Sequence, residues 1–290
     1  MARGKSGQGG KGRGGRGPRR GDRPRDRAPA TGKRHGGKTP ARPPFPDQLE
    51  GRNLVLAGLT VSRRVRTIWI DEGARGSKIS ALEAAAREQK VPVRRVSRDA
   101  LDAVAEARIH NGVIGFADGL PSTSLKEVLE DCFEAQRDPL ILILDQVQYE
   151  QNLGAVLRTA CAAGVDAIVV PTRRGASLTP TVQRIAMGGA EEVPVVREGM
   201  MSALATLRRA AVRIVGTDAH AEAPYTAADL TGPVAIVMGG EDRGLSSAIA
   251  ERCDAIVRIP MRPSRAVTSL NVSVSTALLL YERVRQLGQA

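Results

Sequence analysis

Three short polar motifs, each following an apolar stretch, carry the residue types that could do chemistry in this chain. The first lies after residues 140–144 and contains Asn152, Gly154 and Arg158. An asparagine here can cap a helix, and a helix start presents free amides to a ligand phosphate. Arg158 lies six residues after Asn152, about one and two-thirds helical turns, so only its length lets it reach back toward the strand end. Taken alone, an ordinary capped helix with a surface arginine explains this motif more simply.

The second motif follows residues 234–238 and reads Gly239-Gly240-Glu241-Asp242-Arg243-Gly244-Leu245. Gly239 and Gly244 have the spacing of a phosphate-binding P-loop, but Leu245 stands where its lysine must be, which excludes nucleotide hydrolysis. Paired glycines let a flat ligand lie against bare backbone, and Glu241 would place a carboxylate beside a cationic group. A strand-to-helix turn that needs glycine for a positive φ explains this segment equally well.

The third motif follows residues 255–259 and has two parts, Ile259-Pro260-Met261 and Ser269-Leu270-Asn271-Val272-Ser273. We predict that Ser269 caps the last helix. That helix carries one apolar stripe, formed by Leu270, Val274, Ala277, Leu278 and Tyr281. Asn271 and Ser273 fall on its polar side. A plain amphipathic helix explains neither the Ile-Pro-Met segment nor this cluster of hydroxyl and amide groups.

From residue 139 onward, apolar strands and helical stretches alternate strictly. The predicted strands cover residues 140–144, 167–170, 193–196, 212–216, 234–238 and 255–259. Continuous apolar strands separated by helices are typical of a parallel sheet buried on both faces. Such a sheet binds its ligands outside the carboxyl ends of its strands, which is where all three motifs lie. The predicted fold class is therefore α/β.

Residues 47–120 show a different pattern of shorter elements. Helices are predicted over residues 54–59, 79–87 and 98–108, the last capped by Ser97, and strands over 65–70, 91–96 and 112–117. This pattern indicates a second, small α/β unit. A connection with its own predicted helix, residues 125–135, leads from it into the larger unit.

The positive charge of the chain is concentrated at its N-terminus. Residues 1–44 hold 14 Lys and Arg and 2 Asp, and 14 − 2 = +12 equals the net charge of the whole chain. The same segment holds 12 Gly and 6 Pro, so it has almost nothing to bury and we predict disorder. Arginine forks bind phosphate, which favours contact with RNA over a purely solubilising tail.

Several classes of protein are excluded by composition. No apolar run reaches the roughly 18 residues of a membrane span, and the N-terminus lacks the apolar core of a signal peptide. The three cysteines and three histidines are scattered without metal-ligand spacing, which is typical of reduced thiols in a cytoplasmic protein and does not favour a metal enzyme. Seven aromatic residues leave little material for a base-stacking surface.

Together, the Asn-Leu-Gly…Arg, Gly-Gly-Glu…Gly-Leu and Ile-Pro-Met…Ser-Leu-Asn-Val-Ser motifs resemble those of the SpoU (TrmH-type) RNA 2′-O-ribose methyltransferases. Residues 47–121 resemble, more weakly, the ribosomal-protein-like RNA-binding domain of members acting on ribosomal RNA. The cues there are Glu50-Gly51-Arg52-Asn53 and His110-Asn111-Gly112-Val113. The predicted organisation is a basic arm over 1–46, an RNA-binding domain over 47–121, a linker over 122–138 and a methyltransferase domain over 139–290.

The resemblance implies a C-terminal trefoil knot of the SPOUT type, a homodimer, and S-adenosylmethionine as cofactor, without a metal. The cofactor would be held by Gly239, Gly240, Ile259, Met261 and Leu270. The reacting centre would be surrounded by Asn152, Arg158, Glu241, Ser269 and Asn271, with Arg158 supplied across the dimer. The implied reaction is methylation of a ribose 2′-hydroxyl in ribosomal RNA, in the cytoplasm, as in members acting on guanosine of the large subunit.

The expected mechanism has no obvious general base, because no histidine lies in the three motifs. A guanidinium stays protonated in proteins. We therefore expect Arg158 to hold an RNA phosphate and to stabilise the developing alkoxide, with orientation of the reactants doing much of the work.

Two features depart from the family pattern. Tyr149-Glu150 stands where Asp-Pro is usual, and the stretch over residues 262–268 is longer than usual and carries two arginines. Three alternative functions stay open: the same reaction on transfer RNA, a non-catalytic RNA-binding protein, and a dinucleotide-dependent oxidoreductase. Absence of a GxGxxG segment after any strand makes the last remote. The separate N-terminal domain and the arm favour a large structured RNA over transfer RNA.

Overall fold

The computed structural model describes residues 40–107, 109–173, 175–240, 244–262 and 269–288. The basic arm predicted over residues 1–46 therefore lies outside the described residues, apart from its last segment, 40–46. No helix in the described ranges is long and apolar enough to cross a membrane.

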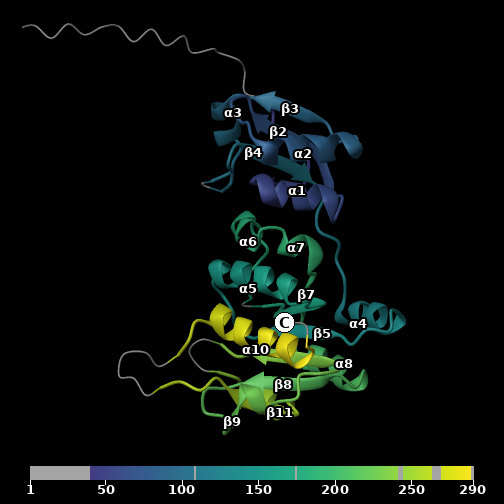
Figure 1. Ribbon diagram of the computed structural model, residues 1–290, viewed down its shortest axis with the longest axis vertical. Coiled ribbons are helices and arrows are strands. Elements are labelled where there is room, and N and C mark those ends of the chain that lie inside the picture. The colour runs from purple at the N-terminus through teal and green to yellow at the C-terminus, as the bar shows by residue number, and fades with distance from the viewer. Residues whose placement is uncertain (1–39, 108, 174, 241–243, 263–268, 289–290) are drawn as a thin grey trace, which may run out of the picture. The chain divides into compact units, whose positions relative to one another are not determined.

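The first sheet has four strands in the order β1-β4-β2-β3 (Figure 1). Its strands are β1 (Asp47–Glu50), β2 (Val65–Asp71), β3 (Val93–Val96) and β4 (Val113–Ala117). The helices between them are α1 (Arg52–Thr60), α2 (Ser77–Glu88) and α3 (Arg98–Asp102). β4 runs antiparallel to β1 and β2, whereas β2 and β3 are parallel. This confirms a small α/β unit, to which the structure adds the unpredicted strand β1.

Helix α3 is shorter than the predicted 98–108, although Ser97 caps it as expected by accepting a hydrogen bond from the Ala100 amide. The buried carboxylate of Glu50 explains the early end of the helix. It accepts hydrogen bonds from the backbone amides of Glu106 (2.6 Å) and Ala107 (2.9 Å). Those amides point to a side chain instead of to helical carbonyls, so the backbone leaves the helix after Asp102.

The second sheet has seven strands in the order β7-β6-β5-β10-β8-β11-β9, and every neighbouring pair is parallel. The strands are β5 (Leu140–Leu144), β6 (Ala167–Pro171), β7 (Val195–Glu198), β8 (Arg213–Thr217), β9 (Ala223–Pro224), β10 (Val234–Met238) and β11 (Ala255–Arg258). The predicted parallel sheet is therefore confirmed, and β5 and β10 have the predicted bounds. The two-residue strand β9 was not predicted.

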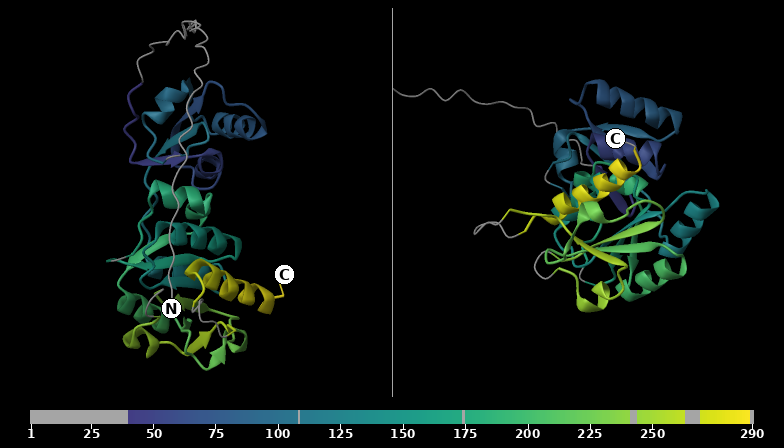
Figure 2. Two further views of the ribbon diagram at one scale, coloured as in Figure 1. Left: turned by 90° about the vertical axis from the view of Figure 1, so that its left-hand side faces the viewer. Right: turned by 60° about the horizontal axis from the view of Figure 1, so that its bottom comes forward.

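Helices cover both faces of this sheet. They are α4 (Leu125–Glu134), α5 (Glu150–Ala162), α6 (Pro180–Ala186), α7 (Gly189–Glu192), α8 (Met200–Arg209), α9 (Ser247–Ala250) and α10 (Val272–Gln286), with the 3-10 turn η1 (Tyr225–Ala227). α10 crosses one face of the sheet (Figure 2). α6 and α7 were not predicted, and α7 explains why β7 starts two residues later than the predicted strand over 193–196.

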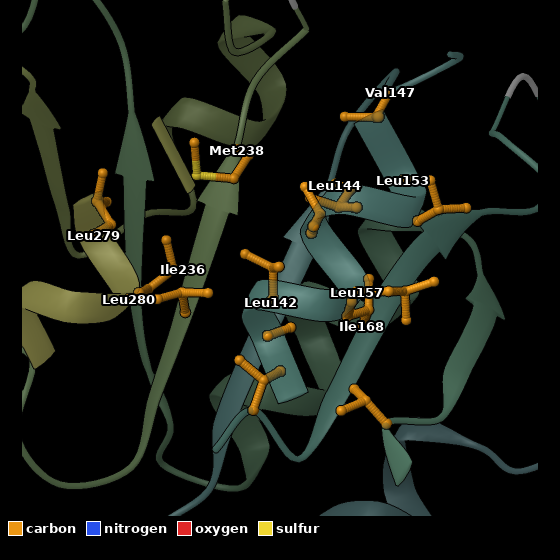
Figure 3. Packing of buried hydrophobic residues seen from close by; sticks show 14 of the residues in the cluster. Leu142, Leu144, Val147, Leu153, Leu157, Ile168, Ile236, Met238, Leu279 and Leu280 are labelled. Atoms are coloured by element: carbon orange, nitrogen blue, oxygen red, sulfur yellow. The ribbon is translucent and has the colours of Figure 1, made fainter. Parts of the chain in front are cut away.

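Alternate residues of the central strands fill two separate cores. Leu142 and Ile236 point to one face, where they meet α5 and, through Leu279 and Leu280, α10 (Figure 3). Ile141 and its neighbours point to the other face. There they pack with α4 and α8, so the predicted linker over residues 122–138 contributes a helix to the core of this sheet. Strands buried on both faces explain why their apolar runs are continuous.

Candidate active site

A cavity of about 440 Å³ lies at the carboxyl ends of β8, β10 and β11. Its lining comes from the segments that follow these three strands. All five residues predicted to hold the cofactor line it, namely Gly239, Gly240, Ile259, Met261 and Leu270. Ser269, one of the residues predicted for the reacting centre, lines it as well. The second and third motifs therefore meet at one place.

Gly239 and Gly244, which follow β10, have no room for a side chain. A Cβ on Gly239 would lie 2.5 Å from the carbonyl carbon of Gly244, and Gly244 has a φ of +62°. The backbones of Gly240 and Gly244 exchange two hydrogen bonds of 3.1 Å. The turn itself thus needs glycine, and the same glycines leave bare backbone on the cavity wall. Glu241 lies between them, outside the described residues.

Asn152 does not cap α5, contrary to the prediction. The helix begins at Glu150 with Tyr149 in the cap position, so Asn152 lies inside the first turn. A glutamate at the helix start complements the positive end of the helix dipole. The side chain of Asn152 points across to the third motif, where its Oδ1 accepts a hydrogen bond of 3.0 Å from Nδ2 of Asn271.

Asn271, not Ser269, is the cap of α10. Its Oδ1 accepts hydrogen bonds from the backbone amide of Ser273 (2.9 Å) and from the Ser273 hydroxyl (2.6 Å). Capping therefore uses the oxygen of the Asn271 amide and leaves its NH₂ group for Asn152. Ser269, released from capping, lies in the cavity wall.

The apolar stripe predicted on the last helix faces outward. Leu270, Val274, Leu278 and Tyr281 are exposed, with Val274 and Tyr281 about half exposed at 49% and 51%. The opposite face is buried instead, through Val272, Thr276, Leu279 and Leu280. Arg283 is buried on the same face. Its guanidinium donates hydrogen bonds to the backbone carbonyls of Leu230 and Gly232, which offsets the loss of contact with water. An amphipathic pattern alone could not decide which of two apolar faces meets the core.

Arg158 is exposed on α5 and does not line the cavity. Within the described part of the chain, no hydrogen bond or ion pair involves its guanidinium. The structure therefore brings Asn152 to the third motif, but it does not bring Arg158 of the same chain to the cavity wall.

The segment after β8 was missed by the motif search. Thr217, Asp218, Ala219 and His220 all line the cavity. Asp218 is held in place by the backbone amide of His220, which donates to its Oδ1 at 2.8 Å. The rule that located the three motifs, a position after a parallel strand, would also have located this segment. It has no glycine pair or polar cluster to mark it.

Asp145, at the end of β5, is a buried carboxyl group beside this site. It is 5% exposed, and burial raises its pKa, an effect partly offset by a long hydrogen bond of 3.4 Å from Gln146. A Cβ on Gly240 would lie 3.3 Å from the Cβ of Gln146. Gln146 therefore packs closely against Gly240 of the cavity wall.

Two family models match this chain. The model described as the SpoU rRNA Methylase family matches residues 139–281, and the model described as RNA 2′-O ribose methyltransferase substrate binding matches residues 48–122. The fold and these matches define an RNA methyltransferase whose N-terminal region resembles a substrate-binding domain.

Relatives agree with this class. The 23S rRNA (guanosine-2′-O-)-methyltransferase RlmB of Pseudomonas putida is 42% identical over 227 residues, which cover 77% of this chain and 90% of the relative. The putative TrmH family tRNA/rRNA methyltransferase YacO of Bacillus subtilis is 32% identical over 241 residues, covering 83% and 96%. The chain belongs to the SpoU rRNA methylase family, which confirms the resemblance seen in its motifs.

Solved structures show the same fold. The SpoU methyltransferase AviRb of Streptomyces viridochromogenes, in complex with AdoMet, has a TM-score of 0.69 at 25% identity and covers 84% of this chain and 91% of its own. A crystal structure described as an RNA 2′-O ribose methyltransferase has a TM-score of 0.66 at 29% identity, covering 83% and 88%.

Proposed function

We propose that this protein methylates the 2′-hydroxyl of a guanosine ribose in large-subunit ribosomal RNA, with S-adenosylmethionine as methyl donor. The observation that carries the proposal is the cavity at β8, β10 and β11, which is lined by every residue expected to hold the cofactor. The names of the RlmB relatives support the choice of ribosomal RNA and of guanosine.

The residues of the cavity fit this cofactor. Its volume of about 440 Å³ falls within the range of about 300–1,000 Å³ usual for small-ligand sites. Gly239 offers bare backbone on the cavity wall, at a position where a Cβ would collide with Gly244, whereas Ile259, Met261 and Leu270 offer apolar contacts. When bound, S-adenosylmethionine supplies a methyl group on a positively charged sulfur.

The chain's own residues would position the ribose and stabilise charge. Asn152 and Asn271 form a joined pair of amides beside the cavity wall at Ser269 and Leu270. Arg158 would hold an RNA phosphate and stabilise the developing alkoxide, because its guanidinium stays protonated. His220 lines the cavity, but β8 and β5 are separated by β10, which places their ends about 10 Å apart. We therefore assign His220 to the cofactor rather than to the 2′-hydroxyl.

We further propose a homodimer that meets through the exposed stripe of α10. The stripe borders two apolar grooves, which also involve Tyr225 and Met261. A second copy would cover this surface, since contiguous exposed apolar patches usually mark an interaction site. The partner's copy of Arg158 would then complete the cavity, which agrees with its absence from the cavity wall of its own chain.

Mixing two inactive variants tests the shared site. In a heterodimer of Arg158→Ala and Asn152→Ala subunits, one site has both residues intact if arginine crosses the dimer. Random mixing should then restore about a quarter of wild-type activity, since half of the dimers are mixed and each has one complete site. No recovery, with heterodimers shown by native mass spectrometry, would place Arg158 in the site of its own chain.

Four finer expectations belong to the same proposal. The chain after β10 would be knotted, which is supported by β11 lying beyond β8 while α10 returns to pack in the core with α5. Residues 47–121 would form the RNA-binding domain, 122–138 the linker and 139–290 the methyltransferase domain. The arm over 1–46 would add sequence-independent affinity for RNA. The reaction would take place in the cytoplasm.

Transfer of labelled methyl groups to fractionated RNA tests the proposed function. Ribosomal and transfer RNA are separated after incubation with the enzyme and labelled S-adenosylmethionine, and Arg158→Ala serves as control. We expect label in ribosomal RNA at an alkali-resistant linkage, lost in the control. Label in transfer RNA would support the first alternative. No label in either fraction, with the cofactor still bound, would instead favour a non-catalytic RNA-binding protein.

A further inference from the structure

Arg64 lies directly before β2, but most of its partners belong to other parts of the chain. Its side chain is 5% exposed. Nε and one terminal nitrogen donate to the two carboxylate oxygens of Glu191 on α7, both at 2.7 Å, and Gln183 on α6 accepts a further hydrogen bond of 3.1 Å. The other terminal nitrogen binds Asp47 on β1 (2.5 Å) and the backbone carbonyl of Asp118 (2.6 Å). One guanidinium thus joins the four-stranded sheet to two helices of the methyltransferase unit.

Glu191 is satisfied by the same cluster. Its side chain is fully buried and also accepts a hydrogen bond of 2.6 Å from the Ser62 hydroxyl. A bidentate arginine–carboxylate pair has a defined geometry, unlike a single contact between point charges. A buried pair of this kind contributes little net stability, and in some proteins such pairs specify one arrangement of the elements that they join.

The turn between α6 and α7 fits against α1 without a gap. Gly188, in this turn, has a φ of +104°, and a Cβ there would lie 2.7 Å from the Cβ of Ala57. Glycine therefore meets two demands at once, a left-handed backbone and a close approach to α1.

The same two helices lie tightly against α5, which carries Asn152 and Arg158 (Figure 1). A Cβ on Gly189 would lie 2.8 Å from the carbonyl oxygen of Leu157 and 3.4 Å from the Cα of Arg158. A Cβ on Gly154 would lie 2.6 Å from the Cβ of Ile185. Backbone contacts this close leave no room for α6 and α7 to slide on α5.

We infer that Arg64 and Glu191 are positioning residues, which hold the substrate-binding domain in one orientation relative to helix α5. RNA bound by residues 47–121 then approaches Arg158 in one orientation, because the domain that binds it does not rotate freely. The effect on RNA methylation rests on the proposed function, whereas the fixed orientation of the domain does not. It predicts discrimination in favour of RNAs long enough to contact both units.

The test uses the full-length double variant Arg64→Met/Glu191→Met, which removes both charges together. Removing only Arg64 would leave the buried carboxylate of Glu191 without an ion-pair partner and endanger folding. Glu191→Gln keeps the shape of the side chain and leaves Arg64 its ion pair with Asp47, so it serves as the milder second variant. Arg66→Ala is the matched control, because Arg66 pairs with Asp118 on the same sheet but at an exposed position.

The orientation itself is measured by the distance distribution between two spin labels, at Ser80→Cys and Ser202→Cys. Both serines are exposed, and Cys161 and Cys253 are changed to Ser in the same background. We expect a narrow distribution in the parent and in Arg66→Ala, and a broad one in the double variant. An equally narrow distribution in the folded double variant would overturn the inference, whether or not any RNA is methylated.

The consequence is measured by kinetics on two RNAs, a long ribosomal fragment and a short stem-loop with the target nucleotide. We expect the double variant to lose at least about tenfold in kcat/KM on the long RNA, since misplacement of about 1 Å can cost more. Glu191→Gln should show a smaller loss of the same kind. The stem-loop rate and cofactor affinity should change less than about twofold. Equal losses on both RNAs would overturn the positioning role, whereas a wild type inactive on all RNA would reject only the proposed function.

Discussion

Nδ2 of Asn271 donates a hydrogen bond of 3.0 Å to Oδ1 of Asn152, across 119 residues of sequence. The orientation of the Asn271 amide follows from its second task, since its oxygen caps α10 through Ser273. The cap at the start of α10 thereby orients the amide of Asn271 toward the first motif. The pair ties the start of α10 to the first turn of α5, so the positions of these two helix ends depend on each other.

Asn271→Asp separates the cap from the hydrogen bond to Asn152. Aspartate caps a helix about as well as asparagine, so the unfolding temperature should stay close to that of the wild type. The variant has no NH₂ group for Asn152, and its charge would repel the Asn152 oxygen. We expect methyl transfer to fall on the order of a hundredfold. Asn271→Ala, which also lacks the cap, should in addition lose about 1 kcal/mol of stability; unchanged activity in the aspartate variant would show that the pair has no part in the reaction.

Gly239→Ala should distort the cavity that we propose for the cofactor, at a moderate cost in stability. The new Cβ would lie 2.5 Å from the Gly244 carbonyl carbon, so the loop must shift, and overpacking of this kind costs about 1–3 kcal/mol. We expect affinity for S-adenosylmethionine, measured by calorimetry, to fall at least about tenfold. Gly199→Ala is the matched control because nothing lies within 4 Å of its Cβ position. Equal affinity in both variants would contradict the placement of the cofactor.

Arg158→Lys tests what the guanidinium does. Lysine keeps the positive charge but cannot bind a phosphate with two parallel hydrogen bonds. We expect kcat to drop on the order of tenfold or more at saturating RNA, while the affinity for RNA, measured by filter binding, changes little. Full activity with lysine, at matched RNA affinity, would rule out an essential role for the planar fork.

Asp145→Asn should alter the dependence of stability on pH. Burial raises the pKa of Asp145, so the folded state favours the protonated carboxyl group. The resulting stabilisation is fully present below the unfolded pKa, near 3.9. It is lost as the pH rises through the folded pKa. The asparagine variant should lack that loss, and its unfolding free energy relative to wild type should therefore rise with pH above about 4. Urea unfolding at a series of pH values measures this difference.

Asp229→Asn provides a control of opposite sign for this pH series. Hydrogen bonds from Thr231 and Arg213 lower the pKa of Asp229 to about 2. Its contribution is present above the unfolded pKa and is lost as the pH falls toward 2. A pH dependence of Asp145→Asn that matched that of Asp229→Asn would contradict the burial effect.

Local pattern was a sound guide to the strands and a poor one to helix starts. Leu140–Leu144 and Val234–Met238 have the predicted bounds because both faces of these strands are buried and the apolar run is continuous. Asn152 and Ser269 were wrongly predicted as caps. Several residues near each helix start could accept the cap hydrogen bond, and packing of the helix decides which one does.

What the sequence determined by itself was the parallel α/β sheet, the three motifs at the carboxyl ends of its strands, and the family. These follow from periodicity, from backbone needs of glycine and from residue types, all of which are local properties. Tertiary structure alone decided that Asn271 meets Asn152, that His220 joins the cavity, and that Arg64 binds Glu191. It also decided that the apolar stripe of α10 faces outward. Each of these depends on which elements meet in space, and burial then selects among contacts that the local pattern allows equally.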